Sequence, residues 1–465
     1  MSGFRGIEIG KSAVSAHQLA LEVVAQNVAN ANAPGYSRQV AKLKPLDAQA
    51  SPWGTVEKFS GRGVDVERVI RLRDAFLDKQ IRQETSAFGE ASAKLNNLNQ
   101  IQVVMDELSD TGIRARLDEF WDSLHELSLY PESLSVRGAL VQRALALCEA
   151  FKHTVNWLGQ LQQNVSEEIE ASVSRINDIG RQIKELNEQI VRAKARSETP
   201  NTLEDKRDSL IDEMAELVPV DVTTLPEGAT IVKVAGVPLV ETDFVRELSF
   251  SKAGPGGFPI VTWGIEENPL QPVAGRLKGL LEVRDQAITS YIENLNELAR
   301  SIVAEVNAVH REGFALDGTT TGLDLFTIGT GAAEMGVVQD IVQNPSLLAA
   351  SRNGTPGDGS NAIRMAALKQ DKLMAGGSAT WDDFIRSVTA RLGIETQEAK
   401  RVCDNQELLV KDLENRRQSV SGVSIDEEAT EMIKLQHAYA AAARLITTCD
   451  ELLDVLINRT GVVGR

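Results

Sequence analysis

The residues best suited to chemistry are few in this chain and lie far apart. The five histidines stand at positions 17, 125, 153, 310 and 437. None of them has a second ligand-type residue at the spacing of a metal site. The three cysteines, Cys148, Cys403 and Cys449, are widely separated and odd in number, so no disulfide framework is indicated. The sequence therefore predicts no metal-binding residue, and none of its many acidic residues is singled out as catalytic.

Sequence motifs of enzymes and cofactor sites are also missing. No H-E-x-x-H, G-x-S-x-G, Walker or C-x-x-C motif occurs. The segment GTGAAE (329–334) begins like a dinucleotide fingerprint, but Glu334 stands where the third glycine belongs. DGTTTGLD (317–324) and GTPGDGSN (354–361) are polar like calcium loops, but their acidic residues do not alternate as such loops need. We expect ordinary turns there, no cofactor and no enzymatic activity.

Composition narrows the possible partners of this chain of 465 residues. Its formal charge of −17 argues against a nucleic-acid groove or an anionic membrane surface, since both require clustered positive charge. A hydrophobic content of 42% supports a folded core, and the 5% aromatic content favours helices. No segment has the apolar length of a signal peptide or a membrane span.

The first predicted helix carries a seven-residue hydrophobic repeat. Ile7, Val14, Leu21 and Val28 recur strictly, and Gly10, His17 and Val24 fall between them. Such a seam buries little area on its own, and we therefore expect it to pack against a partner helix.

The stretch NVANANAPGYSRQV (27–40) ends this helix abruptly. Proline lacks an N–H and disfavours a helical residue before it, and Pro34-Gly35 suits the centre of a type II turn. We expect this break to aim the terminal helix relative to the rest of the chain. Its predicted residues are Asn27, Asn30, Asn32, Pro34, Gly35 and Tyr36.

The middle of the chain alternates long helices with short irregular parts. Residues 36–70 look extended, and helices resume near Asp74. Apolar residues spaced by three and four from Val155 to Ile190 predict a rod of about 40 residues, roughly 60 Å long. Thr202 and Asp205 have capping-box spacing, so we expect an antiparallel helix to open there and to run to Leu217.

Downstream, the pattern changes twice more. Residues 218–267 predict short strands in a small sheet, and residues 275–310 predict a helix. Residues 313–378 are rich in glycine, threonine and aspartate, and we expect them to be irregular and surface-exposed. A final helical region from Thr380 is interrupted at 419–424.

The last predicted helix mirrors the first. Ser424 and Glu427 have capping-box spacing, and a heptad seam follows them. The seam residues expected in an assembly interface are Ile425, Met432, Tyr439, Ile446 and Leu453. Because both chain ends carry an uncovered apolar stripe, we expect the two terminal helices to pair with each other and then with neighbouring molecules.

We predict a mainly α protein in which the N- and C-terminal helices pair as a coiled coil, beside a central bundle of long helices and a small β or irregular outer part. The expected domains are the N-terminal half of the inner coiled-coil domain with its extended break (1–60), a helical bundle (61–220), a small β insert (221–267), a continuation of the bundle (268–312), an irregular or β outer segment (313–379), a return helix of the bundle (380–420) and the C-terminal half of the coiled-coil domain (421–465).

Both chain ends resemble the bacterial flagellar axial proteins, the family of rod, hook and hook-associated proteins. NVANANAPGYSRQ is similar to the shared start of that family, whose usual motif ends in Thr-Pro-Gly-Tyr; here Ala33 replaces the threonine. SVSGVSIDEEATEM (419–432) is similar to the closing segment. NTLEDKRDSLIDEMAELVPVDV (201–222), GRLKGLLEVRDQAI (275–288) and GFALDGTTTGLDLF (313–326) resemble hook-associated members rather than the hook protein.

The resemblance implies a structural subunit of the junction between hook and filament that polymerises through its terminal helices. The implied partners are further copies of the chain, the hook protein, hook-associated protein 3 and an export chaperone on the C-terminal segment. The implied location is outside the cell, reached through the flagellar type III channel without a cleaved signal peptide. Exported flagellar proteins have few cysteines, so we expect free thiols here. We also expect terminal segments that are disordered before assembly.

Two alternatives stay open at this point. Within the family, the chain could be hook-associated protein 3 or the hook protein. From another class, residues 223–267 or 313–378 could form an enzymatic insert, which would require an acidic pair or a histidine to converge in a cleft. Residues 223–267 contain no histidine or cysteine.

Overall fold

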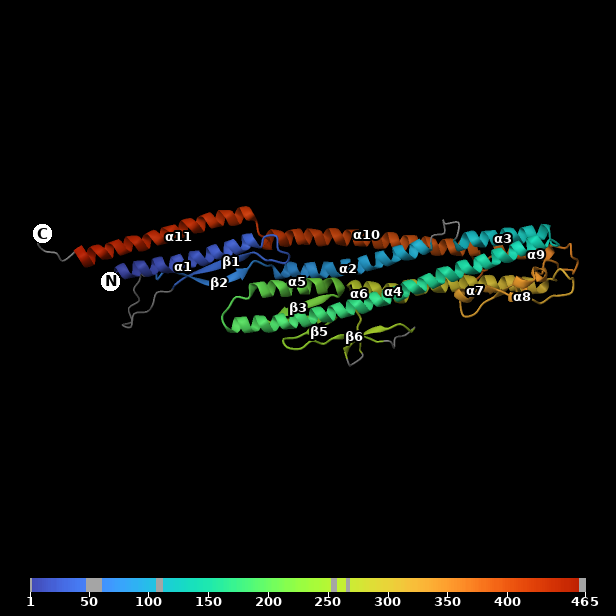
Figure 1. The fold of residues 1–465 in the computed structure, drawn as a ribbon, viewed down its shortest axis with the longest axis horizontal. Helices are drawn as coiled ribbons and strands as arrows, with labels where there is room; N and C mark the ends of the chain where they lie inside the picture. The colour runs from blue at the N-terminus through green and yellow to red at the C-terminus, as the bar shows by residue number, and fades with distance from the viewer. Residues whose placement is uncertain (1, 47–60, 106–111, 252–256, 265–267, 460–465) are drawn as a thin grey trace.

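The computed structural model describes residues 2–46, 61–105, 112–251, 257–264 and 268–459, which form an elongated and mainly helical molecule (Figure 1). Both chain ends lie at the same end of the molecule, on the neighbouring helices α1 and α11. The long helices are α1 (Ser2–Ala29), α2 (Ala75–Val104), α3 (Ile113–Leu129), α4 (Leu134–Ala195), α5 (Asn201–Leu217), α7 (Thr289–Glu312), α10 (Trp381–Ser421) and α11 (Ile425–Asp454). This confirms the predicted mainly α fold with paired terminal helices.

We call α1, α11 and the hairpin of β1 (Gln39–Pro45) and β2 (Val64–Arg71) the terminal unit. Helices α1 and α11 run antiparallel, and the hairpin lies along α1 (Figure 1). Helix α1 ends at Ala29, inside the predicted break that begins at Asn27. The Tyr36 N–H donates to the Ala33 carbonyl at 3.2 Å and Gly35 has a φ of 75°, as the predicted turn requires.

The remaining long helices form the bundle. Helix α4 has 62 residues, so it is about 90 Å long and the predicted length of 40 residues is too short. Its buried face already includes Leu140 and Phe151, and Ser133 caps its start. Helix α5 returns antiparallel to α4 and ends at Leu217 as predicted. The predicted capping box is wrong, because Pro200 precedes α5 and Asp205 binds groups outside its helix.

The predicted β region forms two antiparallel sheets rather than one. Two buried asparagines on α4 hold them. Asn177 exchanges hydrogen bonds of 2.8 Å with the backbone N–H and carbonyl of Leu248, and Asn187 binds the backbone of Thr230 in the same way. The strands are β3 (Val220–Thr224), β4 (Thr230–Val234) and β5 (Val237–Val240) in one sheet, and β6 (Leu248–Ser251), β7 (Ile260–Trp263) and β8 (Asn268–Pro269) in the other.

A further helical stretch follows the sheets. Helix α6 (Arg276–Glu282) continues through a π-helical turn (Val283–Ile288) into α7. The Gln162 side chain donates to the Arg284 carbonyl inside this turn at 2.9 Å. Among the described residues, no helix combines the length and the apolar composition that crossing a bilayer requires.

The irregular segment 313–379 is not the exposed surface that its composition predicts. It contains the short strands and helices β9 (Phe326–Thr327), β10 (Gly336–Val337), α8 (Gln339–Gln343) and α9 (Ser360–Ala367), and Phe326 and Met365 are buried. Asn307 of α7 accepts hydrogen bonds from the Leu325 and Phe326 N–H groups, both at 2.9 Å. The expectation is wrong because polar side chains of α7 satisfy this irregular backbone and allow it to be buried.

His310 fixes the same segment as a neutral imidazole. Its Nε2 accepts from the Ala349 N–H at 3.0 Å, so Nδ1 carries the proton and donates to the Leu323 carbonyl at 2.7 Å. Burial lowers the pKa of His310, and this effect outweighs the opposing contributions of the Leu323 carbonyl and Asp324.

We therefore expect acid to destabilise the bundle through His310. The folded pKa lies below the unfolded value of about 6.5, so the unfolded state binds the proton first and stability falls as the pH drops below that value. Urea unfolding at pH 7.5 and 5.5 measures the loss, with a slope of at most about 1.4 kcal/mol per pH unit from this residue. His310→Gln should reduce the pH dependence, whereas the matched change of exposed His125 should preserve it. Equal slopes for all three proteins would contradict this role.

Candidate assembly surface

Within the described residues, the side chains suited to chemistry do not converge on one site. No cluster of three or more histidine, cysteine, aspartate or glutamate side chains in those ranges has the arrangement of a metal site. A cavity of about 480 Å³ between α2, α3, α4, α7 and α10 is lined mainly by apolar side chains; its lining includes His153 but no acidic residue. The terminal unit and its attachment to the bundle are therefore the candidate functional features.

Helix α1 packs closely on α11 through small residues. Gly6 faces the Sγ atom of Cys449, and a Cβ atom on Gly10 would lie 2.5 Å from Cγ1 of Ile446. Ala16 and Ala20 are buried on the same helix. Gly10 falls between the residues of the predicted repeat, but Gly6, Ala16 and Ala20 were missing from it, because glycine and alanine add little to a hydrophobic pattern.

A matched pair of glycine substitutions tests this close approach. Alanine is about 1 kcal/mol better than glycine inside a helix, and no neighbouring atom opposes it at Gly393 of α10. At Gly10 the added methyl group would overlap the side chain of Ile446, which has little freedom to move away. This overlap should lower the stability of the helix pair by about 1–3 kcal/mol. A net loss of about 1 kcal/mol raises the population of the open state about fivefold. We therefore expect Gly10→Ala to speed amide exchange in α1 and α11 by about that factor. Gly393→Ala should leave it unchanged. Unchanged exchange in both variants would contradict tight packing.

The predicted interface positions differ in how far they are buried within the helix pair. On α1, Val24 is buried and the other four, Ile7, Val14, Leu21 and Val28, are half-buried. On α11, Met432, Ile446 and Leu453 are half-buried, and Ile425 and Tyr439 are exposed. Contact with other molecules stays a prediction for all ten.

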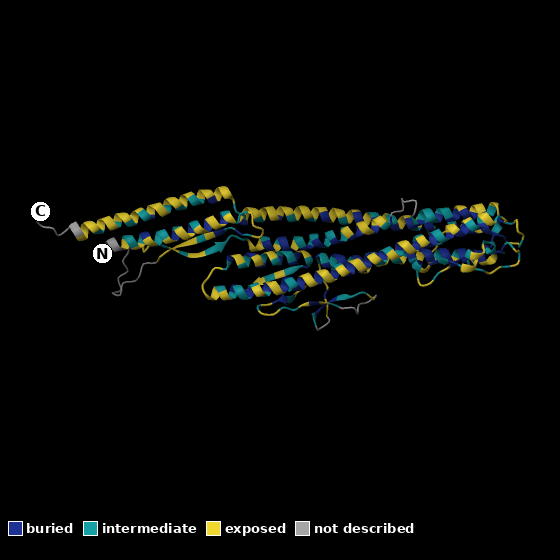
Figure 2. Cartoon of the chain, in the orientation of Figure 1, coloured by how far each residue is buried: buried dark blue, intermediate teal, exposed yellow. Residues whose placement is uncertain are grey.

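Helix α11 leaves an apolar face uncovered, and Figure 2 shows most of this helix as exposed. Ile433 is 56% exposed and Leu452 is 59% exposed, on a helix that contacts the rest of the chain along one stripe. The exposed large apolar residues of α11 and the π-helical turn after it are Ile425, Ile433, Tyr439, Leu445, Leu452, Val455, Leu456 and Ile457. A surface of this kind is typical of an interaction site.

Asn27 is the centre of the helix break and is almost fully buried. Its Nδ2 donates to the Gln39 carbonyl at 2.8 Å and to Oε2 of Glu428 at 2.9 Å. Its Oδ1 accepts from the Gln39 N–H at 3.0 Å and from the Tyr36 hydroxyl at 2.9 Å. Burial, with the nearby charges of Asp205 and Glu428, raises the pKa of Tyr36 to about 12, so its hydroxyl remains a donor.

The other residues of the predicted break have separate roles. The Asn30 Nδ2 donates to the Gln26 carbonyl at 2.9 Å and so adds a hydrogen bond to the last turn of α1. Asn32 is exposed, and Pro34 and Gly35 form the turn. The structure thus brings Asn27 and Tyr36 together and leaves Asn32 outside this contact.

Arg38 joins the break to the start of α11. Its Nε donates to Oε1 of Glu428 at 2.7 Å, and its Nη1 donates to Glu427 at 2.8 Å. Its backbone N–H donates to the carbonyl of Ser421, the last residue of α10, at 2.9 Å. Ser424 caps α11 as predicted. The contact between residues 27–39 and 421–428 therefore fixes where α11 begins.

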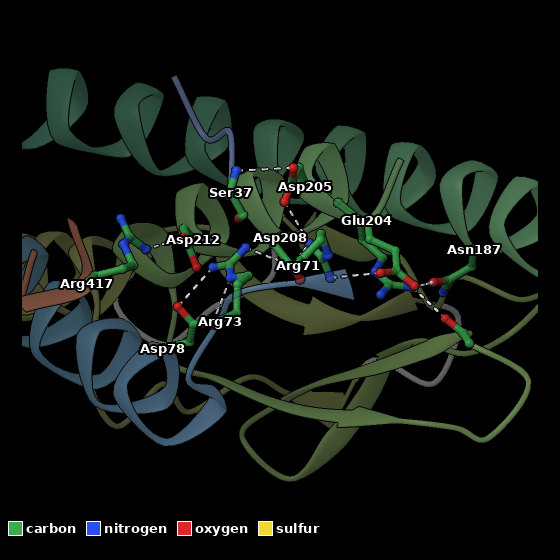
Figure 3. A network of polar contacts seen from close by, with 12 residues as sticks. Ser37, Arg71, Arg73, Asp78, Asn187, Glu204, Asp205, Asp208, Asp212 and Arg417 are labelled. Carbon is green, nitrogen blue, oxygen red and sulfur yellow. Dashed lines mark hydrogen bonds and ion pairs between the residues drawn. The ribbon is translucent and has the colours of Figure 1, made fainter. Parts of the chain in front are cut away.

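Arginines from several elements surround one acidic face of α5 (Figure 3). We call these arginines and their acidic partners the junction cluster. Asp208 accepts from Arg71 and from Arg73, both at 2.8 Å, and lies 3.9 Å from Arg82. Burial alone would raise the pKa of Asp208, but the charges of these arginines outweigh it and lower the pKa. The cluster comprises Arg71, Arg73, Asp78, Arg82, Glu204, Asp205, Asp208, Asp212 and Arg417.

Comparisons with known proteins agree with this division of the molecule. A family model described as the flagellar hook-associated protein FlgK helical domain matches residues 98–326, most of the bundle. Models described as flagella basal body rod protein and flagellar basal body rod FlgEFG protein C-terminal match residues 7–36 and 415–459. The last two ranges cover most of α1 with its break and nearly all of α11.

Individual relatives match over the whole length. Flagellar hook-associated protein 1 of Bacillus subtilis is 32% identical over 507 aligned residues, with both chains fully covered. The protein of the same name in Escherichia coli is 25% identical, covering 96% of this chain and 98% of its own. The solved flagellar hook junction protein FlgK from Burkholderia pseudomallei superposes with a TM-score of 0.66 at 16% identity, covering 74% of this chain and all of the other.

Proposed function

Since this chain belongs to the flagellar hook-associated protein 1 family, we propose that its terminal unit is the part that enters the flagellar tube and polymerises there. The protein is a structural subunit of the junction between the hook and the filament of the bacterial flagellum. Its bundle is the part specific to this family, whereas its ends are of the kind found in rod proteins.

The observation that carries the proposal is the uncovered apolar face of α11. This face belongs to the same residues that match the rod-protein models, so a surface in need of cover coincides with segments shared among tube-forming proteins. Neighbouring subunits would cover it. The ten predicted interface positions and the six residues of the break belong to this proposal.

The structure describes α1 and α11 as paired helices within one chain, in contrast to the disorder expected from the sequence. Because α11 contacts the rest of the chain along one narrow stripe, we propose that the pair is marginally stable in the free subunit and becomes fully ordered on assembly. Residues 1–60 and 421–465 would then act as one domain, separate from the bundle.

The finer features of the role belong to the same proposal. The partners are copies of the chain, the hook protein, hook-associated protein 3 and an export chaperone that covers the apolar face of α11. Export proceeds through the flagellar type III channel without a cleaved signal, to a site outside the cell. The chain carries no enzymatic activity: in the candidate insert 313–378, Asp324 pairs with Arg311 and Asp358 binds nearby backbone N–H groups.

Imaging of flagella tests the proposal directly. Cells lacking the gene should build complete hooks without filaments, and the intact gene should restore the filaments. Hooks that still carry filaments in the deletion strain would overturn the assignment. A variant with the bundle unchanged and α11 removed should behave like the deletion, although the protein is made.

A further inference from the structure

The segment 201–222 has no role in the proposed polymerisation, although it is one of the segments that carry the family resemblance. In the structure it forms α5, which lies where the terminal unit meets the bundle (Figure 1). Two short stretches of chain connect these parts, residues 72–74 between β2 and α2 and residues 422–424 between α10 and α11. Two such connections restrict the terminal unit but leave its angle to be set by other contacts.

Apolar packing is incomplete on the side of the helix break. A cavity of about 610 Å³, open to solvent, lies between the turn and the bundle there. Its walls are residues 30 and 33–36 on one side and residues of α4 and α5, among them Leu186 and Leu210, on the other. The turn approaches α5 closely at Gly35, where a Cβ atom would lie 3.5 Å from Ser209, so shape complementarity supplies only part of the contact.

Polar contacts cross the gap beside this cavity, and Asp205 makes two of them. Its Oδ2 accepts from the Ser37 N–H at 3.3 Å, and its Oδ1 accepts from Nη1 of Arg71 at 2.8 Å (Figure 3). Ser37 lies just before β1 and Arg71 ends β2, so one carboxylate binds the chain at the start of one strand and at the end of the other. The Asp205 side chain is 7% exposed, which makes these contacts strong.

Neighbouring groups support Asp205 without replacing it. Arg71 also contacts Glu204 at 3.0 Å and Asp208 at 2.8 Å. Asn201 donates to Oε1 of Gln39 at 3.0 Å and to the Val69 carbonyl at 3.2 Å, so it also contacts both strands. Asp205 differs from Asn201 because it carries a charge, and among the described residues of the junction cluster it alone binds both Ser37 and Arg71.

We propose that Asp205 is the positioning residue that sets the angle between the terminal unit and the bundle. This inference rests on the proposed function, because a fixed angle matters for a subunit that must present its terminal unit to a preformed tube. The carboxylate acts through Ser37 and Arg71 and not through contact with a partner. Segment 201–222 thereby gains a role, which is orientation of the assembling part.

Distance measurement between spin labels tests the angle. One label replaces exposed Arg444 on α11 and the other exposed Gln163 on α4, in a chain whose three cysteines are changed to serine. The parent should give one narrow distance distribution. Asp205→Ala should broaden it at least twofold, and Asp205→Asn should broaden it less, because its single amide oxygen can replace only one of the two carboxylate oxygens that accept from Ser37 and Arg71. Asp412→Ala, at an exposed ion pair on α10, serves as the matched control.

The outcomes separate this inference from the proposed function. Attachment of Asp205→Ala to isolated hooks should fall about tenfold at a temperature where the bundle of the variant stays fully folded, and Asp205→Asn should reduce attachment less. A narrow distance distribution in Asp205→Ala, or a broad one in the parent, would overturn the positioning role. Normal attachment of the parent to hooks would at the same time leave the proposed junction function intact. Failure of the parent itself to attach would instead refute the proposed function.

Discussion

Replacing Asp208 by alanine is expected to lower the free energy of unfolding of the bundle by about 3 kcal/mol. The change leaves Arg71, Arg73 and Arg82 without their shared carboxylate in a site where the Asp208 side chain is 16% exposed. Breaking a buried ion pair by removing one partner typically costs about 3–5 kcal/mol, because the remaining charge is neither hydrated nor paired. Each arginine keeps another acidic partner, and the site is partly exposed, so the expected loss lies at the lower end of that range.

The matched control is Asp412→Ala. Asp412 pairs with Arg416 at 2.8 Å, but both side chains are more than half exposed. Pairs of this kind contribute about 0–1 kcal/mol. Urea unfolding of both variants therefore compares two aspartate–arginine contacts of equal length and different burial. Equal losses would show that the junction cluster is not a stabilising feature.

The second large effect is expected at Leu453 in α11. This side chain is half-buried on α11, a helix of the terminal unit. An aspartate there places a charge in the contact between terminal helices, so we expect binding to isolated hooks to fall at least tenfold. The melting temperature of the bundle should not change, because its buried core contains no residue of α11.

Leu408→Asp on α10 is the control for that substitution. Leu408 is 66% exposed and belongs to the bundle, so the same change in charge should leave both hook binding and melting unaffected. Unfolding of the bundle by Leu453→Asp would refute the separation of the terminal unit from the bundle. Normal hook binding by Leu453→Asp would refute its part in assembly.

Local patterns predicted the helices well because their causes are local. The three- and four-residue spacing of apolar side chains identified α4, and Pro34 identified the end of α1. The start of α4 was missed, although the buried face continues through Leu140. The turn at Gly35 followed from backbone preferences alone.

Long-range contacts could not be predicted in the same way. Asn27 resembled a loop residue, yet it is buried through a partner 401 positions away, Glu428. Asp205 had the spacing of a helix cap, but its carboxylate binds Ser37 and Arg71 because the tertiary fold brings them near. The predicted interface also lay on the large apolar residues of the terminal seam, whereas the close contact of α1 with α11 is made by Gly6 and Gly10. Polar and small residues carry no periodic signal of their partners.

Hydrogen exchange of the free subunit and of the assembled hook junction tests the main idea most directly. We expect the amides of residues 5–28 and 425–453 to exchange quickly in the free chain, and those of α4 to exchange slowly. After assembly, exchange in the terminal helices should slow by at least a hundredfold while that of α4 stays constant. Terminal helices that are as protected in the free chain as in the junction would contradict the account.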